Sequence, residues 1–320
     1  MKTLLLLPIL LISNAVLSQQ PAEVQPFLRD IFANYSNIRD FTISSAENEA
    51  YFTLQSPLAE FSVIIMIEKK NGAWAEPEIA SFSGKYADLE PFLAPDGLRL
   101  YFASNRPVDP TSDKAKDFDI WYVERPEKEG EWSIPLNMGD SINTEYNEFY
   151  PSVALSNNLY FTSYQPHSKR RDDIYMSKWD NNTYSSPIPL SDSINTKGSE
   201  FNAFIAPDES FIIFSSWNRK DGVGGGDLYI SYKKGMDSWS NARNLGEKIN
   251  SKQVDYCPYV NVETGTLFFT SKRSDFNVRE SGYSSYRALM DEINKYENGF
   301  SRIYQVNIGK ILSRKESKHR

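Results

Sequence analysis

The hydrophobic pattern of this chain consists of short apolar runs, separated by polar turns, that recur at intervals of about fifty residues. Aromatic and β-branched runs bounded by Gly, Pro, Asn and Asp are typical of strands rather than helices. Each unit centres on a bulky apolar pair followed by Thr, Ala or Ser, and the pairs are Tyr51-Phe52, Tyr101-Phe102, Tyr160-Phe161, Ile213-Phe214 and Phe268-Phe269. This repeat predicts a β-structure arranged around an axis.

Each unit divides into four predicted strands. The second strand carries the apolar pair, the third begins with a motif such as Asp119–Tyr122, and an aromatic three residues before Pro or Ala marks the fourth. Because a lone four-stranded sheet cannot cover both of its faces, neighbouring sheets must bury each other. The pattern therefore predicts an all-β fold, a β-propeller of four-stranded antiparallel blades. An acidic residue opens the first strand of each unit, and these opening acids are Asp40, Asp88, Glu148, Glu200 and Asp255.

The spacing after each fourth strand predicts the blade count and the closure of the ring. In three units an Ile-Asn pair follows the fourth strand at a fixed distance, and Pro26 and Asn34 repeat this spacing. The segment Val24–Leu28 is therefore predicted to be a fourth strand without a blade of its own. The last unit, after Arg302–Tyr304, lacks a fourth strand. We expect five blades closed by the N-terminal strand, with six blades as the alternative.

One segment departs from the repeat. An insertion at about 276–299 carries apolar residues at helical spacing, namely Tyr286, Leu289, Met290, Ile293 and Tyr296. This spacing predicts a short helix on one face of the ring, packed against its own protein. The propeller domain is expected to cover residues 19–309, followed by a basic tail at 310–320.

The first eighteen residues are predicted to be a signal peptide. Lys2 precedes the leucine-rich run Leu4–Ile12, and small residues at Ala15–Ser18 offer a cleavage site. This layout is typical of secretory signals, and the apolar run is too short to span a bilayer. We expect export to the periplasm or the cell surface, with an uncleaved membrane anchor as the alternative. Cys257, the one cysteine, is expected to be a buried free thiol.

Charge and motifs exclude several function classes. The net charge of -7 disfavours nucleic acid and anionic membranes as partners. The stretch Gly222–Asp227 lacks the Gly-Lys-Ser/Thr step of a phosphate-binding loop. His167 and His319 stand in unrelated polar segments, and no calcium loop with the pattern D-x-[DN]-x-[DN]-G occurs in the sequence. We therefore expect no cofactor and no metal ion, with calcium held by Asp-rich loops as the alternative. The chain is also expected to be a monomer.

The best-preserved unit carries a family resemblance. The segment Leu93–Arg106, LAPDGLRLYFASNR, followed by Asp119–Tyr122, resembles the WD40-like PD40 repeat of TolB-like propellers. The Trp-x-x-Pro, Leu-Gly and Ile-Asn-Thr steps are similar to those of envelope proteins of Bacteroidota-type Gram-negative bacteria. The resemblance implies a non-catalytic platform for protein–protein contacts. TolB itself resembles a six-bladed ring with an extra N-terminal domain, and many relatives carry an OmpA-like module, whereas neither is predicted here.

A carbohydrate-active enzyme or lectin is the alternative function, because five-bladed propellers also host glycosidases. Such enzymes need two or three carboxylates in distinct environments at a set separation. The opening acids instead occupy the same place in successive units, which favours a backbone-capping or inter-blade role. Acids that open the third strands are expected to pair with bases that end the second strands; the acids are Asp119, Asp173 and Asp227, and the bases are Arg106, Arg219 and Arg273.

The loops that lead into the inner strands are expected to gather at one mouth of the central channel. Their mixture of aromatic and acidic residues suits a specific contact with an envelope protein or a glycan. The acidic character favours a basic ligand. No catalytic residue is predicted. The candidate partner-binding residues are Tyr146, Glu148, Phe149, Glu200, Phe201, Asp255 and Tyr256.

Overall fold

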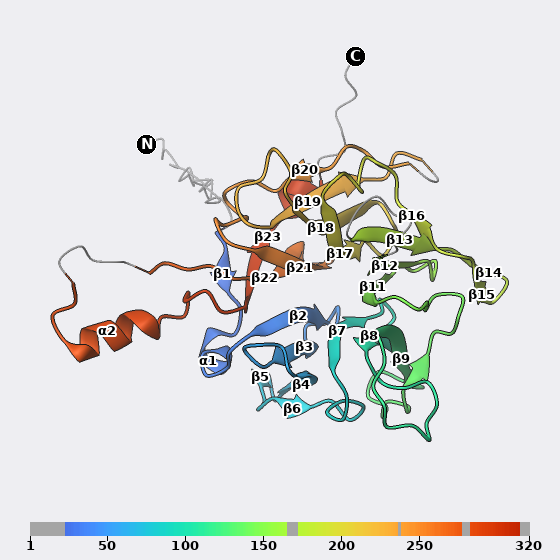
Figure 1. Ribbon diagram of the computed structural model, residues 1–320, viewed down its shortest axis with the longest axis horizontal. Helices are drawn as coiled ribbons and strands as arrows, with labels where there is room; N and C mark the ends of the chain where they lie inside the picture. Colours follow the sequence, from blue (N-terminus) through green and yellow to red (C-terminus); the bar gives the residue numbers. More distant parts are fainter. Residues whose placement is uncertain (1–22, 165–171, 236–237, 277–281, 314–320) are drawn as a thin grey trace, which may run out of the picture.

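The computed structural model confirms an all-β fold in which five antiparallel sheets surround an axis as a five-bladed β-propeller (Figure 1). No helix in the described part of the chain is long and apolar enough to cross a membrane. The predicted signal peptide, His167, His319 and the end of the basic tail lie outside the described residues. The structure describes residues 23–164, 172–235, 238–276 and 282–313.

The strands of each blade are given from the channel outward. Blade 1 consists of β2 (Ile38–Ile43), β3 (Glu49–Gln55), β4 (Ser62–Lys70) and β6 (Glu78–Ile79), with β5 (Ala73–Trp74) also paired to β4. Blade 2 consists of β7 (Asp88–Leu93), β8 (Arg99–Ser104), β9 (Asp119–Glu124) and β10 (Leu136–Asn137). Blade 3 consists of β11 (Glu148–Val153), β12 (Leu159–Ser163), β13 (Asp173–Ser177) and β16 (Ile188–Pro189), beside a hairpin of β14 (Trp179–Asp180) and β15 (Thr183–Tyr184).

Blade 4 consists of β17 (Ser199–Ile205), β18 (Phe211–Trp217), β19 (Asp227–Tyr232) and β20 (Arg243–Asn244). Blade 5 consists of β21 (Asp255–Asn261), β22 (Thr266–Ser271), β23 (Arg302–Asn307) and β1 (Gln25–Pro26). The described helices are short: α1 (Arg29–Phe32), α2 (Tyr286–Ile293) and α3 (Gly309–Leu312).

The N-terminal strand closes the ring as predicted. The strand β1 pairs antiparallel with β23, and the N–H of Phe27 donates to the carbonyl of Ile303 at 2.9 Å. The last blade is thus built from both ends of the chain. Asn34, whose spacing suggested this arrangement, is exposed, whereas Asn143 is buried. The segment before Asn34 forms α1.

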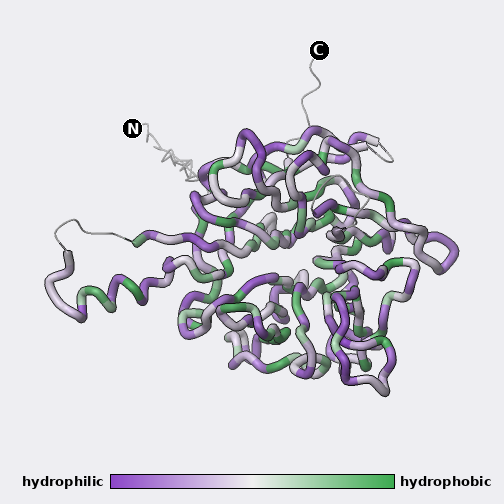
Figure 2. The backbone as a smooth tube through the Cα atoms, in the orientation of Figure 1, coloured by the Kyte–Doolittle hydropathy of each residue, from purple (hydrophilic) through white to green (hydrophobic). Residues whose placement is uncertain are grey.

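The five apolar pairs of the second strands form the interior of the blades. None of these ten side chains is more than 2% exposed. Successive residues of a strand point to opposite faces of the sheet, so each pair buries one side chain against each neighbouring blade. Figure 2 shows hydrophobic positions along the strands and hydrophilic ones in the outer loops. The repeat is therefore the sequence signature of blade-to-blade burial.

The buried asparagine of each Ile-Asn pair fixes the loop that follows the fourth strand. The side-chain oxygen of Asn195 accepts from the N–H of Ile174 at 2.9 Å, and its amide donates to the carbonyl of Ile174 at 3.0 Å. Asn143 and Asn250 make the same pair of bonds in blades 2 and 4. One side chain thus satisfies both backbone groups of a third-strand residue, which explains the fixed spacing.

The insertion forms the predicted helix in a different place. Figure 1 shows α2 projecting beyond the rim of the propeller instead of lying on a face of the ring. Tyr286 is 78% exposed and Ile293 is 46% exposed. Tyr296, beyond the helix, is buried with its ring 6.3 Å from that of Tyr304. The expectation that the whole stripe packs on its own protein is therefore wrong. The helix lies beyond the rim of the propeller, and Tyr296 follows it where the chain returns to the ring.

Each innermost strand carries a β-bulge at the same place. The pairing register shifts there in all five blades, and the bulged residue has a φ between 50° and 60°. A bulge turns its side chain in a new direction and bends the strand, so this position is directed toward the channel. The five bulge residues are Asp40, Glu90, Tyr150, Asn202 and Cys257.

This register corrects one sequence assignment. Asp40 is equivalent to Glu90 and not to the opening acid Asp88. Ile38 occupies the opening place of blade 1, since it lies opposite Leu54 as Asp88 lies opposite Ser104. An acid two residues away from the expected place produced the mistaken alignment.

Candidate functional site

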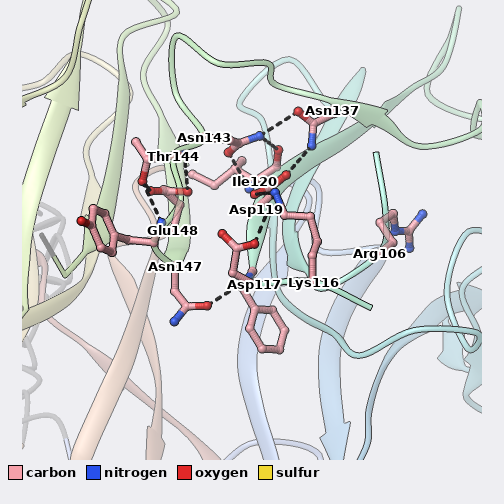
Figure 3. A network of polar contacts seen from close by, with 12 residues as sticks. Arg106, Lys116, Asp117, Asp119, Ile120, Asn137, Asn143, Thr144, Asn147 and Glu148 are labelled. Carbon is pink, nitrogen blue, oxygen red and sulfur yellow. Dashed lines mark hydrogen bonds and ion pairs between the residues drawn. The ribbon is translucent and has the colours of Figure 1, made fainter. Parts of the chain in front are cut away.

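The opening acids of blades 2 to 5 cap the loops that enter the inner strands. Asp88, Glu148, Glu200 and Asp255 are each 0% exposed. Glu200 accepts from the N–H and the hydroxyl of Thr196, both at 2.7 Å. Glu148 bonds Thr144 in the same way, at 3.1 and 2.6 Å (Figure 3), and Asp255 bonds Ser251. Glu148, Glu200 and Asp255 thereby satisfy backbone donors that the loop would otherwise leave unpaired, whereas Asp88 accepts from the hydroxyls of Ser83 and Ser104.

The bases that end the second strands pair with these opening acids. Arg106 lies 2.7 Å from Asp88. Arg219 lies 3.2 Å from Glu200, and Arg273 lies 3.4 Å from Asp255. The predicted pairing of these bases with the third-strand acids is therefore wrong. A strand end can turn toward either neighbouring strand, and here the bases turn toward the inner strand.

The third-strand acids have other partners. Asp119 accepts from the ammonium of Lys116 and from the amide of Asn137, both at 2.8 Å (Figure 3). Asp227 accepts from the N–H groups of Val223 and Gly224, so the glycine-rich loop wraps around a carboxylate of its own chain. Within the described ranges, no three His, Cys, Asp or Glu side chains form a group that could hold a metal ion.

Burial alters the acidity of Glu148. Removal from water raises the pKa of Glu148 from 4.5 to about 7, against the hydrogen bonds from Thr144, and the nearby carboxylates of Asp119 and Asp117 add to the increase. Such a group can exchange a proton near neutral pH. Its carboxylate is nevertheless fully buried and accepts bonds from the loop, so it does not face a substrate.

A polar network joins the bulge residues around the axis. Arg39 lies 2.8 Å from Asp40 and donates to Glu90 at 3.0 Å. The amide of Asn202 donates to the same oxygen of Glu90 at 3.2 Å. The thiol of Cys257 donates to Asp40 at 2.7 Å, and Cys257 is 0% exposed. The carboxylates nearest the axis are thus enclosed by protein groups.

Glu90 takes the place of a hydroxyl acceptor that is missing at the junction of blades 2 and 3. At three of the other junctions a threonine of the preceding blade accepts the N–H of the bulge residue, as Thr162 does from Asn202 at 3.0 Å. Blade 4 carries Ser215 at the corresponding position. The corresponding residue of blade 2 is Ala103, and here Glu90 accepts the N–H of Tyr150 at 2.7 Å. Burial, together with the charge of Asp40, raises the pKa of Glu90 to about 7.

Four of the predicted partner-binding residues are buried. Glu148, Glu200 and Asp255 are the capping acids described above, and Tyr256 is 7% exposed. The hydroxyl of Tyr256 bonds Ser301 at 2.8 Å, and the guanidinium of Arg39 lies over its ring. These side chains therefore cannot make surface contacts. Because these acids are buried, they cannot provide the predicted preference for a basic ligand at this mouth.

The three other predicted residues lie at this mouth with aromatic neighbours that the sequence did not single out. Tyr146, Phe149 and Phe201 are half-buried. The ring of Phe118 lies 5.1 Å from that of Phe149, and the ring of Trp217, 42% exposed, lies 5.4 Å from that of Phe201. Phe149 and Phe201 both pack on the buried cluster of Tyr150, Tyr256 and Cys257. We name Phe118, Tyr146, Phe149, Phe201 and Trp217 the aromatic patch.

A cavity of about 1050 Å³ lies at the opposite mouth of the channel. The inner strands begin beside the aromatic patch and end at the hairpins that lead to the second strands, and those hairpins line the cavity. Phe92, Phe204 and Tyr259 close its floor toward the axis. None of the residues that line this cavity is among the binding residues predicted from the sequence.

The comparisons with known proteins show a similarity of fold and no further relationship. No protein-family model and no curated protein matches the sequence. An α-L-arabinofuranosidase from Lactobacillus brevis is similar at 13% identity over 86% of this chain and 94% of that chain, with a TM-score of 0.51. An endo-arabinase from Bacteroides thetaiotaomicron is similar at 11% identity over 86% and 95% of the two chains, with a TM-score of 0.55.

A TolB structure from Agrobacterium tumefaciens is a looser match, at 13% identity over 74% of this chain and 70% of that chain, with a TM-score of 0.47. The likeness to the two enzyme structures, at 13% and 11% identity, shows the fold and does not indicate an activity. The resemblance to PD40 repeats of the cell envelope stays a prediction.

Proposed function

We propose that this chain is an exported, non-catalytic β-propeller that acts as a protein-interaction scaffold, with a partner protein bound at the aromatic patch. One observation carries the proposal: the opening acids that the repeat brings to the channel are buried and serve as acceptors for the chain's own backbone and side chains. Catalysis by carboxylates requires groups that reach the reacting atoms of a substrate.

The aromatic patch has the composition of a protein contact. Aromatic side chains that are partly exposed and held by a rigid framework are the residues that dominate binding energy at interfaces. Phe149 and Phe201 lie at the start of inner strands, and Trp217 ends a second strand, so the blades position these three side chains. Tyr146 lies in the loop just before β11. With the acids buried, the partner is recognised through apolar and aromatic contacts. The signal-like segment at 1–18 supports an envelope partner.

A carbohydrate-active propeller is the second candidate. It is favoured by Asp40 and Glu90, two acids that share Arg39 near the axis, with the pKa of Glu90 raised to about 7 by burial and by the charge of Asp40. Glycosidases use such pairs of carboxylates in unequal environments. The oxygens of Glu90 already accept from Arg39, Asn202 and the backbone of Tyr150, which weighs against a substrate there.

Capture and turnover experiments on the purified chain from residue 19 onward test the two candidates together. Proteins cross-linked from a cell-envelope fraction are identified for the wild type and for Phe149→Ala combined with Trp217→Ala. We expect the patch variant to lose a defined set of proteins. The matched control, Ile134→Ala with Ile188→Ala, removes exposed side chains from the outer edges of blades 2 and 3 and is expected to keep them.

Turnover is measured on aryl-glycosides and plant and bacterial polysaccharides. We expect none above background. Hydrolysis that disappears in a folded Glu90→Gln variant would establish the carbohydrate-active alternative. Capture that is equal for the patch variant and its control would place the contact elsewhere on the propeller.

A further inference from the structure

The cavity opposite the aromatic patch is formed by all five blades. Its lining includes the hairpin after each innermost strand, and its volume of about 1050 Å³ is at the upper end of the range for small-molecule sites. A space of this size, open at the end of the channel, accommodates several residues of an extended chain. The position is set by hairpins whose strands belong to the rigid blades, so the cavity is formed before any ligand arrives.

The rim of the cavity is aliphatic. The hairpin tips place Pro95, Leu155, Pro207 and Val262 around it, one from each of blades 2 to 5. Leu155 is 66% exposed and Val262 is 40% exposed. The N–H of Leu155 donates to the carbonyl of Pro207 at 2.9 Å, which fixes two neighbouring tips. Large apolar side chains that are exposed to water, on hairpins joined by a hydrogen bond, can anchor the apolar groups of a ligand.

The aromatic rings of the lining are already in contact with neighbouring side chains. The guanidinium of Arg125 lies 4.2 Å from the ring centre of Trp132, and the indole N–H of Trp132 donates to the hydroxyl of Tyr51 at 2.8 Å. The rings of the floor pack on one another, with 5.2 Å between the centres of Phe204 and Tyr259. Because sugars bind by stacking on open aromatic faces, this arrangement favours aliphatic ligands over glycans.

The charge of the lining is acidic. Arg125 donates from its three nitrogens to Glu49 and to the carbonyl of Gly97, at 2.7 to 2.9 Å, so the two charged side chains neutralise each other. The exposed glutamates Glu129, Glu131 and Glu263 also line the cavity, as do Glu68, Lys69 and Lys128. Acids therefore outnumber bases around the opening. This balance favours a cationic group in a ligand.

We propose that the cavity binds an extended peptide segment of a second protein, with aliphatic side chains against Leu155 and Val262 and a Lys or Arg beside Glu129 and Glu131. Both requirements are met by a polypeptide and not by a neutral oligosaccharide. This site is independent of the aromatic patch, because the two lie at opposite mouths of the channel. A propeller with two such sites can hold two partners at once.

Defined probes test the chemistry of the cavity. A fluorescein-labelled ten-residue peptide carries two leucines and two lysines separated by Gly and Ser, and binding to the full mature chain is followed by fluorescence anisotropy. Peptides in which the lysines become glutamates, or the leucines become serines, are expected to bind at least tenfold more weakly. Binding of the first peptide should weaken as salt increases, because exposed charges are screened. Cellohexaose and xylohexaose, followed by calorimetry, should not bind measurably.

Variants locate the binding. Leu155→Asp with Val262→Asp is expected to weaken binding of the leucine–lysine peptide at least tenfold. Glu129→Lys with Glu131→Lys should reverse the preference toward the leucine–glutamate peptide. The control, Ile134→Asp with Ile188→Asp, introduces the same charges at exposed positions outside the cavity and should leave binding unchanged. Circular dichroism and melting midpoints verify that each variant is folded.

Equal affinity for the three peptides would overturn the proposal, as would affinity that the cavity variants do not change. Tighter binding of either oligosaccharide would overturn it in favour of a glycan site. None of these results alters the capture of partners through the aromatic patch, so failure of the peptide site and failure of the proposed scaffold function are distinguishable.

Discussion

Phe27 anchors the strand that closes the ring, and its removal gives the sharpest test of the fold. The strand β1 has two residues, so its backbone pairing alone cannot hold the N-terminus against the last blade. Phe27 is 9% exposed and packs at the seam between blades 5 and 1. Its ring centre lies 5.0 Å from that of Phe41, 5.1 Å from that of Phe268 and 6.3 Å from that of Trp74.

The expected cost of Phe27→Ala follows from this packing. Replacing a buried Phe by Ala costs about 3–5 kcal/mol, which combines lost transfer free energy with a cavity that the surroundings only partly fill. Phe27 lies at a seam that can partly relax, so we expect about 3 kcal/mol at the lower end of that range. For a domain of this size each kcal/mol lowers the melting temperature by about 2–4 °C, so the expected decrease is roughly 6–12 °C.

Urea unfolding followed by tryptophan fluorescence measures the loss, and thermal unfolding confirms it. The matched control is Phe61→Ala, which removes a Phe that is 59% exposed and should change the free energy of unfolding by less than about 0.5 kcal/mol. Hydrogen exchange adds a local readout, because opening of the closure should deprotect β23 more than β9. A loss below about 1 kcal/mol, or unchanged protection of β23, would refute closure by the N-terminal strand.

Three further predictions concern buried polar groups. Burial and the charge of Asp40 raise the pKa of Glu90 from 4.5 to about 7. The folded chain therefore binds this proton more tightly than the unfolded chain, and the free energy of unfolding falls as pH rises between these values. Glu90→Gln should flatten the dependence of urea midpoints on pH over this interval, and an unchanged slope would contradict the assignment. Burial raises the pKa of the Cys257 thiol, which is 0% exposed, so Ellman's reagent should label it at least roughly a hundredfold more slowly in buffer than in urea. Asn195→Ala leaves the buried N–H of Ile174 without its acceptor, although the carbonyl of Ile174 keeps its bond from Leu190, and should cost about 1–3 kcal/mol by urea unfolding. Asn34→Ala, at an exposed turn, should cost nearly nothing.

The repeat made the fold predictable because burial on both faces of a blade demands the same apolar pair in every unit. Ring closure was predictable for a related reason, since the C-terminal unit lacked the strand that the N-terminus supplied. The place of Asp40 was not predictable, because a bulge inserts a residue without a mark in the sequence and Ile38 takes the place of the opening acid in blade 1. The partners of Arg106 and its equivalents were missed because a sequence does not tell to which neighbouring strand a terminal side chain turns.

The candidate site was predictable in position and less so in chemistry. Loops at the start of the inner strands do carry the aromatic patch. Glu200 and its equivalents were expected to cap the backbone and were also candidates for contact with a partner; they are caps, and burial removes them from the surface. The sequence carries a further signal for the cap: Thr196 stands four residues before Glu200, and Thr144 and Ser251 stand at the same distance before their acids. Hydroxyl and carboxylate at this spacing favour a local cap. The cavity was missed because its lining comes from five hairpins distant in the sequence.

Because Glu90 takes the place of a missing hydroxyl acceptor, the repeats of this chain cannot be exchanged for one another freely. The junction of blades 2 and 3 depends on a carboxylate beside Ala103, whereas Thr162 serves the junction of blades 3 and 4. A duplicated or reordered blade would therefore bring the wrong acceptor to a neighbour, even though its own strands would still form. Ala103 and Glu90 must change together if either changes, so the order of the repeats along the chain is as much a part of this architecture as their number.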